Sequence, residues 1–298
     1  MIIVRTIAEL RRALADQRRA GRTIGLVPTM GALHRGHGAL IEQARATTDL
    51  VVVSLFVNPT QFNDAADLDA YPRDEQRDAE FARQAGVDIL FAPTVGEIYP
   101  AGAATSVTVR GPLTETLEAA HRGMAHFDGV ATVVAKLFNI VQPDVAVFGR
   151  KDAQQALVIE QLVRDLDIPV RIAVAPTVRD PDGLALSSRN ARLDQAGRER
   201  ASALPQVLAW AAEELRAGTP ARAVEADAAE RLRDHGLAPE YVAVVNPETL
   251  MPARAGAGAL ILAAVVVDGV RLIDNIAIAD EQRAADVAIA PTTAGVTR

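Results

Sequence analysis

The chain has 298 residues, of which 49% are hydrophobic and 23% charged, with a formal net charge of -7 and no cysteine. This length and composition suffice for a full α/β core with a smaller appended domain. The negative charge offers no basic face for a polynucleotide or a membrane, so we expect neither partner. The lack of cysteine excludes disulfides and thiol catalysis and is compatible with a cytoplasmic location.

The N-terminal segment predicts one surface helix. Met1–Val4 is too short an apolar run for a signal peptide. Thr6 and Glu9 form the capping-box pattern Thr-x-x-Glu, which predicts a charged helix that stops near Gly21. No uncharged apolar run elsewhere is long enough to span a membrane.

The segment Pro28–His37 separates two regular patterns. Residues 24–27 are apolar, as in a short buried strand, and residues 38–47 place apolar side chains at helical spacing. Because proline cannot donate to a strand ladder, we expect the strand to stop at Pro28 and a loop to lead into the helix. The end of such a strand is where a doubly wound sheet opens onto a nucleotide crevice.

Two histidines stand at the start of this predicted helix. Free backbone N–H groups and the helix dipole attract phosphate there, and His34 and His37 add imidazole donors. Gly36 between them leaves room for a ring or a backbone to approach. The pattern therefore indicates a phosphate site, although two histidines at this spacing could instead bind a metal ion or lie at the surface.

Two further polar clusters accompany it. Leu186–Asn190 (LSSRN) follows a turn-like stretch at residues 181–183, which predicts an exposed loop whose hydroxyls and guanidinium can close on a pyrophosphate. Gly149–Asp152 follows the apolar run 145–148 and precedes a helical pattern. It too should lie at the carboxyl end of a strand, where open α/β sheets bind ligands.

The order of elements predicts a Rossmann-like, doubly wound parallel sheet in residues 1–176, because strand patterns alternate with helical ones. The expected strands are 24–27, 50–57, 89–91, 144–148 and 170–174.

Residues 177–298 read as a smaller α+β domain with an antiparallel sheet, which carries the LSSRN loop. Helical stretches near 195–217 and 221–235 precede strand patterns at 241–245, 259–267 and 270–273. Asp268-Gly269 is a strong two-residue hairpin signal. The tail after about residue 286 reads as weakly ordered.

Several motifs in this order resemble those of the pantothenate synthetases, the AMP-forming pantoate–β-alanine ligases of the nucleotidylyltransferase superfamily. The resemblance runs nearly end to end, and several motifs are more specific than one His-x-Gly-His. They are Val27–His37, Ser54–Phe62 (SLFVNPTQF), Tyr71–Arg73, Phe91–Pro100, Phe127–Gln142, Phe148–Gln155 and Asp182–Leu193.

The resemblance implies a reaction in two steps, with ATP and Mg²⁺. Pantoate's carboxylate attacks the α-phosphorus of ATP to give pantoyl adenylate and pyrophosphate, and the amine of β-alanine then displaces AMP. Neither step needs a protein nucleophile, because alignment and donors aimed at developing charge can supply the catalysis. The resemblance also implies a homodimer that forms through the first domain.

The resemblance further assigns roles to particular residues. His34, His37 and Lys151 are implied as catalytic, with His37 as the acid. The implied ATP-binding residues are Met30, Gly31, Ala32, Leu33, His34, Arg35, Gly36, His37, Gly149, Arg150, Lys151, Asp152, Val178, Leu186, Ser187, Ser188 and Arg189. The implied substrate-binding residues are Gln61, Gln155, Met30, Phe56, Arg122 and His126.

Several of these residues also allow plainer interpretations. Asp152 could bind the ribose or hold Lys151, or it could cap the following helix. Gln61 and Gln155 suit hydroxyl and carboxylate oxygens of pantoate, although glutamine is usually a surface residue. The apolar residues Met30, Phe56 and Phe148 could equally be core, and the segment Ser187–Arg189 an ordinary polar turn.

The chain departs from the family pattern at two places. Arg150 and Ala153 replace the usual glutamate and aromatic residue, and the segment 121–127 is one residue longer than usual. We therefore expect normal adenylation and an altered amine step. One alternative is a related nucleotidylyltransferase that adenylates a phosphate-bearing acceptor. It is disfavoured because Gln61 and Gln155 are neutral, whereas a second phosphate would call for arginine or lysine. The other alternative is a paralogue without catalysis, which the intact His34, His37, Lys151 and Arg189 disfavour.

Overall fold

The computed structural model describes residues 1–63, 65–69, 71–254 and 258–278. Contacts divide the chain into two compact units, Met1–Arg198 and Glu199–Arg298. The division therefore falls after residue 198 and not after 176, and the LSSRN loop is grouped with the first unit. Its Ser188 hydrogen-bonds Tyr71, which explains the grouping. The predicted weak order after about residue 286 concerns a part outside the described residues.

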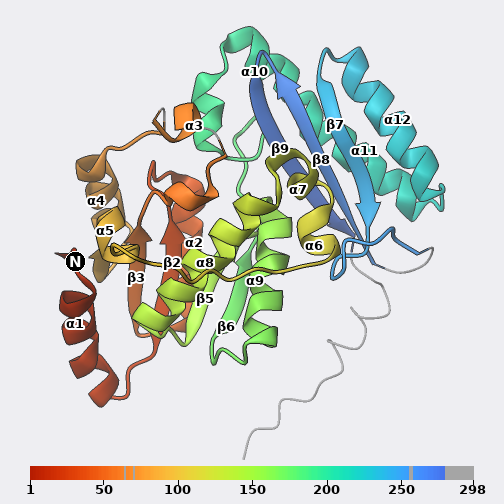
Figure 1. The fold of residues 1–298 in the computed structure, drawn as a ribbon. Coiled ribbons are helices and arrows are strands. Elements are labelled where there is room, and N and C mark those ends of the chain that lie inside the picture. The colour runs from red at the N-terminus through yellow and green to blue at the C-terminus, as the bar shows by residue number, and fades with distance from the viewer. Residues whose placement is uncertain (64, 70, 255–257, 279–298) are drawn as a thin grey trace, which may run out of the picture. The chain divides into compact units, whose positions relative to one another are not determined.

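The first unit is built on a parallel sheet of six strands, in the order β1-β4-β3-β2-β5-β6 (Figure 1). The prediction of a parallel α/β sheet is confirmed. The strand order reverses between β2 and β5, and ligands bind at such a point beside the carboxyl ends of the strands. The strands are β1 (Ile2–Val4), β2 (Ile24–Thr29), β3 (Leu50–Leu55), β4 (Ile89–Phe91), β5 (Val145–Gly149) and β6 (Arg171–Ala175).

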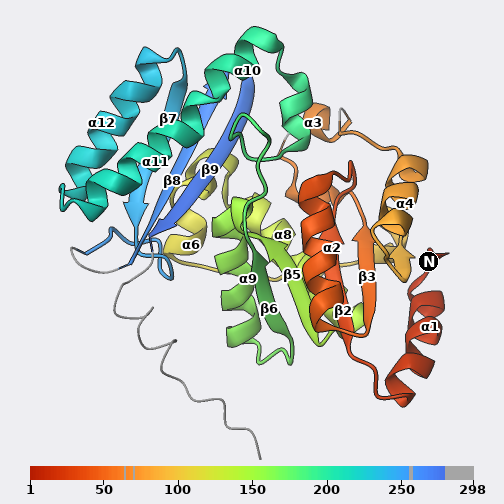
Figure 2. The same cartoon turned by 180° about the vertical axis from the view of Figure 1, so that it is seen from behind.

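Helices pack on both faces of this sheet. One apolar cluster joins the sheet to α1 (Ile7–Arg19), α8 (Met124–Val141) and α9 (Ala153–Asp165), and a second joins it to α2 (Arg35–Thr47) and α4 (Glu75–Gln84). Accordingly, α8 lies in front of the sheet in Figure 1 and α2 in front of it in Figure 2. The sheet thus holds the start of α2 at its carboxyl edge.

Short helices occupy the connections between these elements. They are η1 (Pro59–Gln61), α3 (Ala65–Asp69), α5 (Val95–Ile98), α6 (Pro112–Glu115), α7 (Glu118–Arg122), η2 (Arg150–Asp152) and η3 (Ser188–Arg192).

Two details of the first unit differ from the sequence prediction. β2 does not stop at Pro28 but pairs with β3 as far as Thr29. The proline is tolerated because β5 pairs only with Gly25 and Leu26, so the ladder on that side ends before it. The edge strand β1 was not predicted, since three residues show no period. The predicted capping box of Thr6 at the start of α1 is confirmed.

Helix α8 is the central apolar helix of the first unit. Within the described part of the chain it is the one helix that is long and apolar enough to cross a membrane, by length and composition alone. However, 72% of that stretch is buried inside the fold, as in the core helix of a globular unit. Its apolar character is therefore accounted for by packing against the sheet.

The second unit consists of two long helices and an antiparallel sheet in the order β7-β8-β9. The predicted helix 195–217 is broken at Ser202. Both residues of the predicted hairpin, Asp268 and Gly269, have positive φ, at 49° and 77°, as a tight two-residue turn requires. The elements are α10 (Gln195–Ala201), which begins in the first unit, α11 (Ala203–Arg216), α12 (Ala221–Asp234), β7 (Ala238–Val245), β8 (Ala259–Val267) and β9 (Val270–Ile278).

Candidate functional site

The loop between β2 and α2 is held by a carboxylate from α4. Gly31 and Ala32 have φ values of 94° and 52°, and alanine rarely adopts this left-handed conformation. Asp78, which is 2% exposed, accepts the N–H of Ala32 at 2.9 Å and that of Leu33 at 2.7 Å. A buried charge thus fixes the turn that leads into α2.

The two histidines bond to the backbone at the start of α2. His34 is the N-cap, and its Nδ1 accepts the N–H of Gly36 at 3.1 Å. The Nδ1 of His37 accepts the N–H of His34 at 3.2 Å, and the two rings are 4.2 Å apart. A Cβ on Gly36 would lie 2.8 Å from the His34 ring, which explains the glycine. Each imidazole therefore keeps Nε2 for a ligand.

The environment keeps both imidazoles neutral at pH 7. Burial, followed by the neighbouring His34, lowers the pKa of His37 to about 3. Burial and the charge of Lys151 lower the pKa of His34. A neutral ring whose Nδ1 accepts a hydrogen bond carries its proton on Nε2. With Nδ1 bonded to the backbone, each ring is therefore placed to donate a hydrogen bond from Nε2.

Lys151 and Asp152 follow β5 at the same edge of the sheet. The charges of both act on His34 and His37, so the clusters at the ends of β2 and β5 lie close together. Asp152 occupies the N-cap position of α9 but makes no capping hydrogen bond there. Its Oδ1 lies 3.8 Å from Nζ of Lys151. The contacts thus favour the ion pair with Lys151 over the cap, and ribose binding stays a prediction.

The LSSRN loop follows a tight hairpin of residues 178–186. Its strands meet at Arg179 and Ala185, and the N–H of Leu186 donates to the carbonyl of Val178 at 2.9 Å. A Cβ on Gly36 would lie 3.8 Å from the Cβ of Leu186, so the loop reaches the start of α2. The structure thus brings the third predicted phosphate cluster to the first.

Both serines of the LSSRN loop form hydrogen bonds within the protein. Ser187 caps η3 by accepting the N–H of Arg189 at 3.2 Å. Ser188 hydrogen-bonds the phenol of Tyr71, whose pKa is raised by burial. The hydroxyls of Ser187 and Ser188 therefore have defined partners within the protein.

The predicted pantoate residue Gln61 is oriented by its neighbours. Its Oε1 accepts from Nδ2 of Asn58 at 3.0 Å, and its Nε2 lies 3.0 Å from Sδ of Met30. Asn58 also donates to the carbonyl of Gly129 on α8 at 3.1 Å. Gln61 consequently presents its NH₂ group toward Met30. The partner residue Gln155 lies in the first turn of α9.

The apolar candidates Phe56 and Phe148 both belong to the core cluster of the first unit. Phe56, which is 5% exposed, lines a cavity together with Met30. Phe148 packs edge-on against Phe138 in the core. Leu33 is 1% exposed and its N–H is already bonded to Asp78, so its side chain does not reach a ligand.

The segment 121–127, which the resemblance marks as lengthened, lies at a helix junction. Gly123 has a φ of 76° and separates α7 from α8. Arg122 donates to Oε2 of Glu118 at 3.0 Å, and Nδ1 of His126 lies 2.6 Å from the carbonyl oxygen of Gln61. Both predicted substrate residues therefore have partners within the protein, and His126 supports the segment that carries Gln61.

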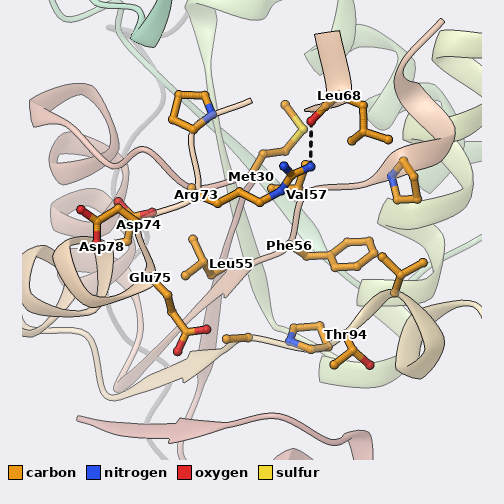
Figure 3. A pocket seen from close by; sticks show the side chains of 16 residues that line it. Met30, Leu55, Phe56, Val57, Leu68, Arg73, Asp74, Glu75, Asp78 and Thr94 are labelled. Carbon is orange, nitrogen blue, oxygen red and sulfur yellow. Dashed lines mark hydrogen bonds between the residues drawn. The ribbon is translucent and has the colours of Figure 1, made fainter. Parts of the chain in front are cut away.

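A cavity of about 320 Å³ lies beside the phosphate loop (Figure 3). Figure 3 shows Arg73 donating to the carbonyl of Leu68, and Asp74 and Asp78 on one side of the cavity. Its lining combines apolar with charged groups. The lining residues are Met30, Gly31, Leu55, Phe56, Val57, Pro59, Leu68, Pro72, Arg73, Asp74, Glu75, Asp78, Ala92, Pro93, Thr94 and Val95.

Sequence reasoning missed two residues that order the site, namely Asn58 and Asp78. One feature of the sequence could have pointed to Asp78: it lies beside Ala79 on the buried side of α4, a helix whose other residues are mostly charged or polar. Within the described ranges, no group of three or more His, Asp or Glu side chains could hold a metal ion.

These features are typical of α/β nucleotide-binding proteins, with the two histidines beside the point where the strand order reverses. The sequence matches the family model described as Pantoate-beta-alanine ligase over residues 2–277, and the chain belongs to this family. It is 51% identical to the pantothenate synthetase of Cereibacter sphaeroides (strain ATCC 17023) over 277 residues, which cover 92% of this chain and 98% of that protein. The pantothenate synthetase of Moorella thermoacetica is 51% identical over 281 residues, which cover 93% and 98%.

Solved structures of related enzymes have the same fold. Pantothenate synthetase from Thermus thermophilus superimposes with a TM-score of 0.88 at 48% identity, over 94% of this chain and 100% of that one. Pantoate-beta-alanine ligase from Francisella tularensis, in complex with beta-gamma ATP and beta-alanine, gives a TM-score of 0.79 at 35% identity, over 93% and 97%.

Proposed function

We propose that this chain condenses pantoate with β-alanine at the expense of ATP, through an enzyme-bound pantoyl adenylate. The observation that carries the proposal is the pair of neutral histidines at the start of α2, with both Nδ1 atoms bonded to the backbone and Lys151 close by. Such fixed donors favour charge on phosphate oxygens without reorganisation. Family membership supports the choice of both substrates.

In the first step, a pantoate carboxylate oxygen attacks the α-phosphorus and pyrophosphate leaves. His34, His37 and Lys151 donate to the phosphate oxygens, and the segment Ser187–Arg189 holds the β and γ phosphates. Part of the charge on these phosphates would be neutralised by Mg²⁺ bound to ATP. Gln61 donates its NH₂ group to pantoate.

In the second step, the neutral amine of β-alanine attacks the acyl carbon and AMP leaves, while the amine loses a proton. The nearby segment 121–127 differs from the family pattern, so a different amine is the alternative specificity. A homodimer and a cytoplasmic location complete the proposal and rest on resemblance to the family.

Exchange of labelled pyrophosphate into ATP tests the first step. We expect exchange that requires pantoate and proceeds without β-alanine. In Lys151→Ala it should slow by about 10²-fold with the free energy of unfolding nearly unchanged. Exchange that depends on β-alanine would remove the adenylate from the mechanism, and exchange without pantoate would indicate another acceptor.

A further inference from the structure

An ion pair joins the start of α2 to the hairpin 178–186. Nη2 of Arg35 donates to Oδ1 of Asp180 at 2.7 Å, across 145 residues of sequence. Arg35 lies between the two histidines in sequence, and the charge of Asp180 acts on His34. The guanidinium of Arg35 is thus directed to the hairpin, although the sequence had assigned it to ATP.

Asp180 binds a second guanidinium with its other oxygen. Nη2 of Arg198 donates to its Oδ2 at 2.7 Å, while Nε of Arg198 donates to Oδ2 of Asp182 at 2.7 Å. The side chain of Asp180 is only 15% exposed. Hydrogen bonds to Arg198, and then to Arg35, lower the pKa of Asp180, so the carboxylate stays charged. Two cations thus bind one partly buried carboxylate, and this arrangement stabilises the contact more than an isolated surface ion pair would.

The backbone of Asp180 also shapes the hairpin. Its N–H donates to the carbonyl of Leu184 at 2.9 Å, and its carbonyl accepts the N–H of Gly183 at 2.9 Å. Leu184 and Ala185 are buried, at 2% and 4% exposure, so the hairpin is anchored on both sides. The chain then passes directly into Ser187–Arg189. A shift of the hairpin would therefore move the hydroxyls and the guanidinium of that segment.

We propose that Asp180 is a positioning residue for ATP. Its two oxygens hold Arg35 and Arg198, which fixes the hairpin on the start of α2. This sets the distance between Ser187–Arg189 and the two histidines, so both halves of the phosphate site are aligned before ATP binds. The inference rests on the proposed phosphate role of Ser187–Arg189.

The test measures KM for ATP, KM for pantoate and kcat in pantoate-dependent pyrophosphate exchange. Asp180→Asn keeps the shape of the side chain but removes its charge. We expect KM for ATP to rise about tenfold, with kcat and KM for pantoate within about threefold, because the reacting groups are retained. Asp180→Glu should restore most of the affinity. Arg35→Gln should raise KM for ATP about threefold, since Arg35 is largely exposed.

The double variant Arg35→Gln with Asp180→Asn should be no worse than Asp180→Asn alone, because both changes remove the same contact. Asp268→Asn is the matched control, since it breaks an ion pair with Arg200 in the second unit and should leave KM unchanged. An unchanged KM for ATP in Asp180→Asn, or an equal rise in both KM values, would overturn the inference.

Arg189→Ala separates this inference from the proposed function. If Arg189→Ala raises KM for ATP strongly while Asp180→Asn does not, the phosphate role of the loop stands and the positioning role of Asp180 is wrong. If Arg189→Ala leaves KM for ATP unchanged, the phosphate role fails and the inference fails with it.

Discussion

The buried carboxylate under the phosphate loop gives the sharpest test of how the site is built. Asp78 accepts two consecutive backbone N–H groups, one of them from Ala32 in its left-handed conformation. We predict that Asp78→Asn loosens this loop and slows adenylation while the protein stays folded. An asparagine side chain can accept only one of the two N–H groups, and its own NH₂ then faces the other.

The expected magnitude follows from these contacts. A hydrogen bond to a charged group contributes about 1.5–3 kcal/mol, and the opposed N–H adds an unpaired buried donor. Ala32 would also gain about 1–2 kcal/mol by leaving the left-handed region, so the loop is under tension that Asp78 resists. A loss of about 2–3 kcal/mol corresponds to an adenylation rate roughly 30- to 150-fold lower.

The assay is single-turnover formation of pantoyl adenylate, together with urea unfolding of each variant. Asp74→Asn is the matched control, because Asp74 lines the same cavity in Figure 3 but caps α4 and does not touch the loop. Ala32→Gly in the Asp78→Asn background should recover about fivefold, since glycine removes the left-handed strain. An Asp78→Asn rate within about threefold of the original, or an equal loss in Asp74→Asn, would refute the reasoning.

Three further predictions concern the segment that carries the pantoate amide and its surroundings. Gly129→Ala would place a Cβ 2.4 Å from the carbonyl oxygen of Thr60. We therefore expect KM for pantoate to rise and the free energy of unfolding to fall by about 1–3 kcal/mol. Gly96→Ala, which has open space around it, should change neither. Burial, followed by the charge of Arg122, lowers the pKa of His126 to about 4, so the unfolded chain binds more protons between pH 6.5 and 4. The stabilisation is full above pH 6.5 and should be about 2 kcal/mol smaller at pH 5, and urea unfolding of His126→Gln should show a shallower pH dependence. Starting from preformed pantoyl adenylate, aminolysis should be slow or poorly selective for β-alanine because the segment 121–127 is altered, and fast selective aminolysis would contradict this.

Features that depend on near neighbours in the chain could be predicted from the sequence. The capping box of Thr6, the hairpin at Asp268-Gly269 and most strands of both sheets followed from turn residues and periods. The α/β class followed from the alternation of those elements. Two of the three predicted phosphate clusters followed from their places after strands, and the LSSRN cluster followed from the turn residues before it. Such patterns are local, so no knowledge of distant contacts was needed to interpret them.

The contacts that hold these clusters in place join distant parts of the chain and could not be predicted from the sequence. Asp78 reaches Ala32 across 46 residues and Asp180 reaches Arg35 across 145, and no spacing rule links positions that far apart. The protonated nitrogen of each histidine depends on backbone N–H groups whose directions appear only once α2 has formed. Each of these side chains has several possible hydrogen-bond partners in the sequence, and the packing of the folded chain selects one of them.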